Sequence, residues 1–91
     1  MCVASVHVKK QAGNSYDVVV SAGTTTLHTV NLTPEYHQKL TSGKVTPETL
    51  IARSFDFLLE RESNESILSQ FELPVIARYF PEYEREIAKR F

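Results

Sequence analysis

The segment TPETLIARSFDFLLERE, residues Thr46 to Glu62, decides the fold, because it has the pattern of one helix with a broad apolar side. Thr46 is a typical N-cap, and Pro47 and Glu48 suit the first turn, where the helix dipole favours an acid. With residues placed about 100° apart, one continuous arc holds Leu50, Ile51, Ala52, Ser54, Phe55, Phe57, Leu58 and Leu59. The sequence therefore predicts a mostly buried central helix from about Pro47 to Glu62.

The same start signal occurs earlier, at Thr33-Pro34-Glu35, and predicts a short first helix. Tyr36 and Leu40 lie four residues apart and form its apolar side. Gly43 follows, and we expect it to end this helix in the left-handed conformation.

Residues 2 to 32 have the alternating pattern of β-strands. Apolar residues at positions 2, 4, 6 and 8 alternate with polar ones. The loop AGNS separates this first strand from a second one, Tyr16 to Ala22, and the turn AGT leads to a third one, Thr25 to Leu32. Three consecutive strands joined by short loops predict a three-stranded antiparallel meander.

Two registers fit the third strand. A two-residue loop at Gly23-Thr24 would pair Val20 with Leu27 and turn Leu27 towards the core. We favour the opposite register, which needs a bulge or a longer loop and turns inward His28, Val30 and Leu32.

The chain after Glu62 is expected to be helical. The residues SNE at 63–65 break the central helix. We expect a short helix around Ile67 to Phe71, another from Pro74 to Phe80, and a last one from Pro81 to Phe91. The predicted fold class is α+β: one domain over residues 1–91, with a β-meander over 1–32 packed against four to five helices over 33–91.

Composition narrows the classes of partner. A formal net charge of −1 gives no general attraction to nucleic acid or to anionic lipid. Cys2 is the single cysteine, which excludes an intramolecular disulfide and fits a reducing compartment. The first residues lack the charged and apolar regions of a signal peptide, and no apolar run is long enough for a membrane span. We therefore expect a cytoplasmic protein with no membrane association.

Three phrases in the chain together resemble a family of short bacterial proteins of uncharacterised function. They are HTVNLTPEYHQKL, TPETLIARSFDFLLERE and SILSQFELPVIARYFPEYE, and the likeness covers about Leu27 to Glu84. The resemblance implies a compact single domain of bacterial origin. It brings no activity, substrate or catalytic residue.

Candidates for catalysis are few. His7, His28 and His37 are spread over two predicted strands and a helix, so no pair has a helical metal-ligand spacing. The three glycines are isolated and form no phosphate-binding loop. We expect no metal, no cofactor and no catalytic residue. A small metal-dependent or hydrolytic enzyme is kept as an alternative, and whether His28 and Cys2 are structural or functional is open.

A nucleic-acid-binding regulator is a second alternative. The segment from Ile67 to Phe80 is predicted to form two short helices of the helix-turn-helix kind, with Arg78 as the candidate contact. Proline at position 81 shortens the second helix, and glutamates at 65, 72, 82 and 84 would repel phosphate. Binding of nucleic acid is therefore not the favoured interpretation.

The favoured interpretation is a non-catalytic protein-interaction module. Aromatic residues are dense near the end of the chain, and tyrosine combines an apolar ring with a polar tip that suits interfaces. We expect an exposed patch with Tyr79, Tyr83 and Phe91, and a protein partner of unknown identity. Homodimerisation through a free strand edge, at SVHV or VNL, is a further hypothesis.

Overall fold

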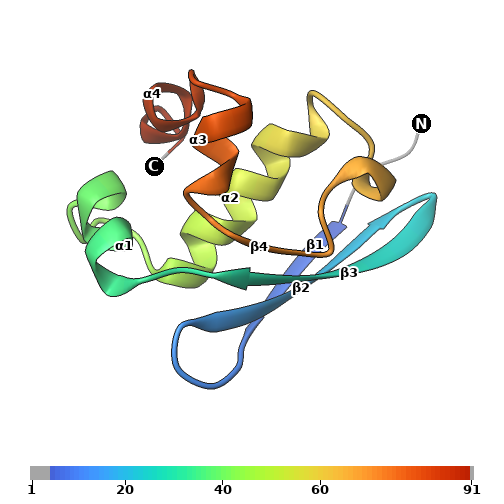
Figure 1. The fold of residues 1–91 in the computed structure, drawn as a ribbon, viewed down its shortest axis with the longest axis horizontal. Helices are drawn as coiled ribbons and strands as arrows, with labels where there is room; N and C mark the ends of the chain where they lie inside the picture. Colours follow the sequence, from blue (N-terminus) through green and yellow to red (C-terminus); the bar gives the residue numbers. More distant parts are fainter. Residues whose placement is uncertain (1–4, 91) are drawn as a thin grey trace.

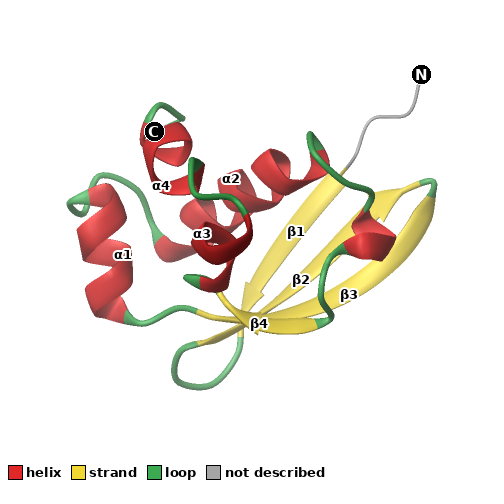
Figure 2. Ribbon diagram, turned by 45° about the horizontal axis from the view of Figure 1, so that its top comes forward, coloured by secondary structure: helices red, strands yellow, loops and turns green. Residues whose placement is uncertain are grey.

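In the computed structural model, which describes residues 5–90, a four-stranded sheet is covered by helices on one face (Figures 1 and 2). Residues 5–90 contain four α-helices and one short 3₁₀-helix, η1. The elements in chain order are β1 Ser5–Lys10, β2 Ser15–Ala22, β3 Thr24–Asn31, α1 Pro34–Thr41, α2 Pro47–Leu59, η1 Asn64–Ser66, β4 Gln70–Glu72, α3 Val75–Tyr79 and α4 Tyr83–Ala88. The predicted α+β class is confirmed.

The sheet has one strand more than the predicted meander. Its order is β1-β2-β3-β4, with the first three strands antiparallel and β4 parallel to β3. The helix predicted around Ile67 to Phe71 is therefore wrong. Ile67 and Phe71 are both buried at a helical spacing of four, but Ile67 follows η1 in an extended conformation and Phe71 lies in β4, paired with β3.

The predicted inward face of β3 is confirmed, but the bulge or longer loop expected to produce it is wrong, because Ala22 pairs with Thr24 and the pairing with β2 is unbroken. His28 lies opposite Val18, and the inward residues His28, Val30 and Leu32 are buried, whereas Leu27 is 59 % exposed. Gly23 lies at the tip, between the paired residues Ala22 and Thr24. Its φ of +87° is in the left-handed region that glycine adopts at little cost, which allows the tight turn.

The two threonine N-caps are also confirmed. The hydroxyl oxygens of Thr33 and Thr46 accept hydrogen bonds from the amides of Tyr36 and Thr49, each at 3.2 Å. At the other end of α1, Ser42 already has a positive φ and closes the helix one residue before the predicted Gly43.

Helix α2 forms the centre of the core, although it ends at Leu59 and not at Glu62. It lies across the face of the sheet (Figure 1). Its buried side packs on inward residues of β2 and β3 and on apolar residues of the later segments. The buried residues of α2 are Leu50, Ile51, Ser54, Phe55, Phe57 and Leu58. No helix in residues 5–90 has the length and apolar character needed to cross a membrane.

Tyr36 joins the first helix to the last. Its hydroxyl donates a hydrogen bond to Glu84 Oε2 at 2.8 Å. Burial, together with this bond to a carboxylate, raises the pKa of Tyr36 above the usual value for tyrosine. The neutral phenol is therefore the form that the fold stabilises.

Tyr36→Phe is expected to lower the free energy of unfolding by on the order of 1 kcal/mol at about pH 8. Because the folded-state pKa of Tyr36 is raised, its contribution is complete below the unfolded pKa of about 10 and is lost as pH rises above it. Urea denaturation of both proteins from about pH 8 to about pH 11 should show the stability difference shrinking. A difference that stays constant over this range would contradict the account.

Candidate interaction groove

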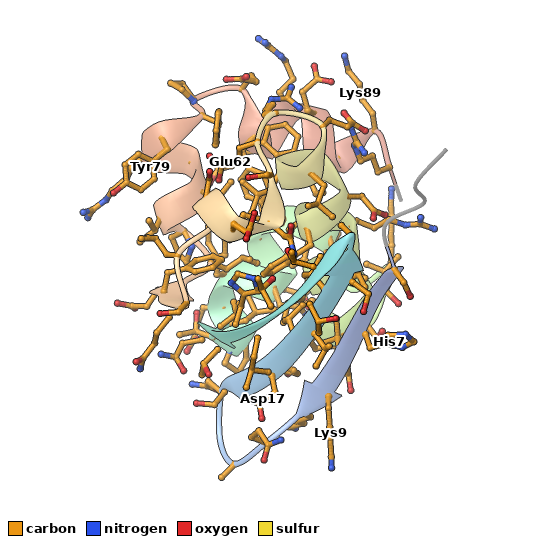
Figure 3. All side chains as sticks on the ribbon, turned by 90° about the vertical axis from the view of Figure 1, so that its right-hand side faces the viewer. His7, Lys9, Asp17, Glu62, Tyr79 and Lys89 are labelled. Atoms are coloured by element: carbon orange, nitrogen blue, oxygen red, sulfur yellow. The ribbon has the colours of Figure 1, made fainter. Side chains whose placement is uncertain are left out.

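The structure places Tyr79 and Tyr83, two of the three aromatic residues predicted to form one exposed patch, in different environments. Tyr79 is 68 % exposed and points away from the molecule at α3, on the other side from His7 (Figure 3). Tyr83 is fully buried, so its predicted place on an exposed patch is wrong. Phe91 lies outside the described residues.

Tyr83 is buried because the core supplies a partner for its hydroxyl. The ring packs on Phe57 with centroids 5.4 Å apart, and the phenol oxygen lies 2.6 Å from Ser54 Oγ. Ser54 uses its own hydrogen to donate to the Leu50 carbonyl at 2.8 Å, so Tyr83 is the donor to Ser54. Burial raises the pKa of Tyr83, which keeps the phenol protonated as this donor.

The two short helices that were predicted to bind nucleic acid are not both formed. Between Ile67 and Phe80 the chain contains β4 and the five-residue helix α3, so the predicted pair of helices is wrong. Arg78 is exposed in the last turn of α3. The nucleic-acid hypothesis keeps this one candidate contact but loses the motif that suggested it.

The histidines lie apart and each has a different local partner. His7 is exposed on β1 with Nε2 3.0 Å from Ser5 Oγ, and His37 Nε2 lies 2.6 Å from the Val45 carbonyl oxygen. His28 is buried in β3. In the described part of the chain, no group of three or more His, Cys, Asp or Glu side chains could hold a metal ion. Cys2 lies outside the described residues.

His28 has a structural role that explains its burial. Its Nδ1 lies 2.7 Å from the carbonyl oxygen of Leu68, and its Nε2 lies 2.8 Å from Thr26 Oγ1. An imidazole with its hydrogen on Nδ1 donates to Leu68 and accepts from Thr26. Thr26 Oγ1 in turn accepts from Asn64 Nδ2 at 3.0 Å, and this nitrogen also donates to the Thr24 carbonyl. The polar network therefore attaches residues 64–68 to β3.

The segment held by this network forms one wall of a groove. A hollow of about 300 Å³ lies between residues 66–71 and α3. A second hollow adjoins it and runs beside β4. The residues that line both hollows are Leu68, Phe71, Val75 and Tyr79. We call these two adjoining hollows the Leu68–Tyr79 groove.

The floor and the rims of this groove differ in exposure. Ile67 and Phe71 lie at the bottom with only 7 and 8 % of their surface exposed. Leu68 and Tyr79 stand at the rims with 48 and 68 % exposed. Leu27 is the other large apolar residue of comparable exposure in residues 5–90, and it lies on the uncovered face of the sheet. Two exposed apolar side chains, Leu68 and Tyr79, thus line the same concave surface.

The groove also carries charged side chains that have no ion-pair partner among residues 5–90. Glu62 lines the first hollow, and Glu72 and Arg78 line the second. None of the three takes part in the salt bridges of the described chain. The charged groups of these three side chains are therefore available to a partner. Glu62 and Tyr79 are labelled in Figure 3.

Only one of the two predicted strand edges is free within the described residues. The edge of β3 that contains VNL is paired with β4, so it cannot serve a dimer. The edge of β1 that contains SVHV is the outer edge of the sheet on that side, and β4 forms the opposite one.

Comparisons with protein-family models, with curated proteins and with solved structures found no match to this chain. The function must therefore be argued from the groove itself.

The Ser54–Tyr83 pair gives a test of the corrected role of Tyr83. Ser54→Ala leaves the buried phenol without its acceptor and should lower the free energy of unfolding by about 1–3 kcal/mol, and Tyr83→Phe by about 1 kcal/mol. The double variant should cost less than the sum, because the two groups are hydrogen-bonded to each other. Urea denaturation measures all four proteins. Strictly additive losses would show that the hydroxyl groups do not interact.

Proposed function

We propose that this protein is a non-catalytic interaction module that binds another protein through the Leu68–Tyr79 groove. The observation that carries the proposal is the pairing of exposed Leu68 and Tyr79 across a concave surface with an apolar floor. Contiguous exposed apolar surface on a small domain is unfavourable in water and commonly marks a contact site. Tyrosine at the rim suits such a site, since its ring packs while its hydroxyl stays hydrated.

The cellular setting belongs to the same proposal. The resemblance to short bacterial proteins and the single cysteine favour a bacterial, cytoplasmic module. The partner's identity is open, and a second copy of this chain is one outcome of the test.

The support for this surface comes from what holds it in place. Leu68 is fixed through its own carbonyl oxygen by buried His28, and Tyr79 lies in the last turn of a helix whose Ile76 is buried. A preformed surface loses less conformational entropy when a partner binds than a loop that must first be ordered. The two rim side chains therefore have the properties of anchor residues at an interface.

The test is a nuclease-treated pull-down with tagged full-length protein from bacterial cytoplasmic extract, using three single variants. Leu68→Ser and Tyr79→Ser should each reduce capture of a stoichiometric partner at least about tenfold, which corresponds to about 1.4 kcal/mol. Leu27→Ser is the matched control, because it removes an apolar side chain of comparable exposure from the other face of the sheet. It should leave capture unchanged.

Thermal unfolding checks that the variants are folded. All three side chains are exposed, so each variant should stay within about 0.5 kcal/mol of the original stability. Equal capture by all three variants would overturn the proposal. Recovery of nucleic acid alone, and only when nuclease is omitted, would favour the regulator hypothesis with Arg78 as its contact.

A further inference from the structure

We propose that the partner binds by adding an extended segment to the open edge of β4, as a fifth strand, with one large apolar side chain seated between Leu68 and Tyr79. This inference rests on the proposed function and specifies the chemistry of the partner: a peptide backbone in the β conformation, an apolar anchor and a basic residue beside it.

The backbone of β4 carries the first part of the argument. The amide of Thr29 donates to the Ser69 carbonyl at 2.8 Å, and the amide of Leu73 donates to the Asn31 carbonyl at 2.9 Å. In a parallel pair, alternate residues of one strand bond to the other. The backbone groups that bond to β3 therefore belong to residues 69, 71 and 73. The backbone amides and carbonyls of Gln70 and Glu72 point to the open side of β4.

These outward groups have no backbone partner within residues 5–90. Two donors and two acceptors in line are the template that an additional strand pairs with. The edge is also bordered by a wall, because the second hollow lies between Gln70 and Glu72 on one side and Arg78 and Tyr79 on the other. An extended segment fits along this hollow.

The first hollow has a size suited to the partner's large apolar side chain, the anchor. Its volume of about 300 Å³ is at the small end of the range for ligand pockets, so it fits one large side chain better than a whole small molecule. Side chains of an added strand alternate in direction, which lets one enter the hollow above Phe71 while its neighbours stay outside.

Charge favours a basic residue next to the anchor. Glu62 lines the hollow for the anchor, and Glu72 lies on the strand edge, both without a salt bridge in the described chain. Among residues 5–90, Arg78 is the single cationic side chain that lines the groove. Two carboxylates and one guanidinium leave an excess of negative charge, which a Lys or Arg of the partner would neutralise.

The other outer edge of the sheet is less suited to pairing. β1 carries His7, Lys9 and Lys10, and charged side chains, lysine above all, discourage strand addition. Neither of the two hollows touches β1.

The experiment is selection of a phage-displayed library of random linear nonapeptides on the full-length protein, followed by synthesis of the enriched peptides. Enriched sequences should share one large apolar residue with an adjacent Lys or Arg. Affinity should fall at least about tenfold for Tyr79→Ser. N-methylation at one set of alternate peptide amides should weaken binding by a similar factor, whereas N-methylation at the other set should not, because only alternate amides of an added strand bond to the edge.

A protein variant tests the same bonds from the other side. Gln70→Pro removes an outward amide that β3 does not use, and proline is tolerated at such edge positions. It should weaken peptide binding at least about tenfold, while Gln70→Ala, which keeps the amide, should not. Circular dichroism verifies that Gln70→Pro is folded, and the N-methylated peptides give the answer should it fail to fold.

Two results would overturn strand addition: no peptide enriched relative to the Tyr79→Ser protein, or enriched peptides that tolerate N-methylation at both sets. The proposed function is tested separately. A cellular partner that is lost with Leu68→Ser and Tyr79→Ser but retained with Gln70→Pro would support the interaction module and contradict strand addition. A partner retained with all of these variants would contradict both.

Discussion

The structure depends on the backbone pairing between β3 and residues 69–73. This parallel contact brings Phe71 beneath α2, where its ring lies 6.1 Å from that of Phe55. It also sets where α3 begins, since the amide of Leu73 is held by Asn31 and the helix follows within two residues. The same pairing creates the open edge and the groove beside it, because a strand bonded on one side leaves its other side free.

A three-residue strand cannot provide much stability by itself, so the polar network behind it matters. His28 reaches across to the Leu68 carbonyl, and Asn64 bonds to two acceptors on β3. The side chains of His28 and Asn64 are buried, and leaving a buried donor or acceptor unpaired costs about 1–3 kcal/mol. No buried side-chain nitrogen or oxygen atom in residues 5–90 lacks a partner. The groove is thus fixed from inside while its rims stay apolar and exposed.

The sequence predicted the features that local chemistry determines. Thr33 and Thr46 cap their helices as expected, and the apolar arc of α2 is its buried side. The inward set on β3 was favoured because His28, Val30 and Leu32 alternate with Thr29 and Asn31, and these three residues are buried. Each of these patterns repeats within one element, so tertiary contacts are not needed to see it.

Three features could not be predicted, and all of them depend on distant residues. β4 has a single inward residue, Phe71, so it shows no alternation, and its spacing from Ile67 imitates a helix. Tyr83 looks suited to a surface until Ser54, 29 residues earlier, is seen to accept its hydrogen bond. Tyr79 was correctly expected to be exposed. The position of Leu68 on the same groove could not be predicted, because it depends on the contact between the Leu68 carbonyl and His28.

The measurement that tests this account most directly is amide hydrogen exchange by NMR on the free protein, residue by residue from Ser69 to Leu73. Pairing on one side only predicts alternation: slow exchange at Phe71 and Leu73, whose amides face β3, and fast exchange at Gln70 and Glu72, whose amides face solvent. Uniform protection or uniform exposure across these residues would contradict it, because then either the edge is not open or the strand is not formed.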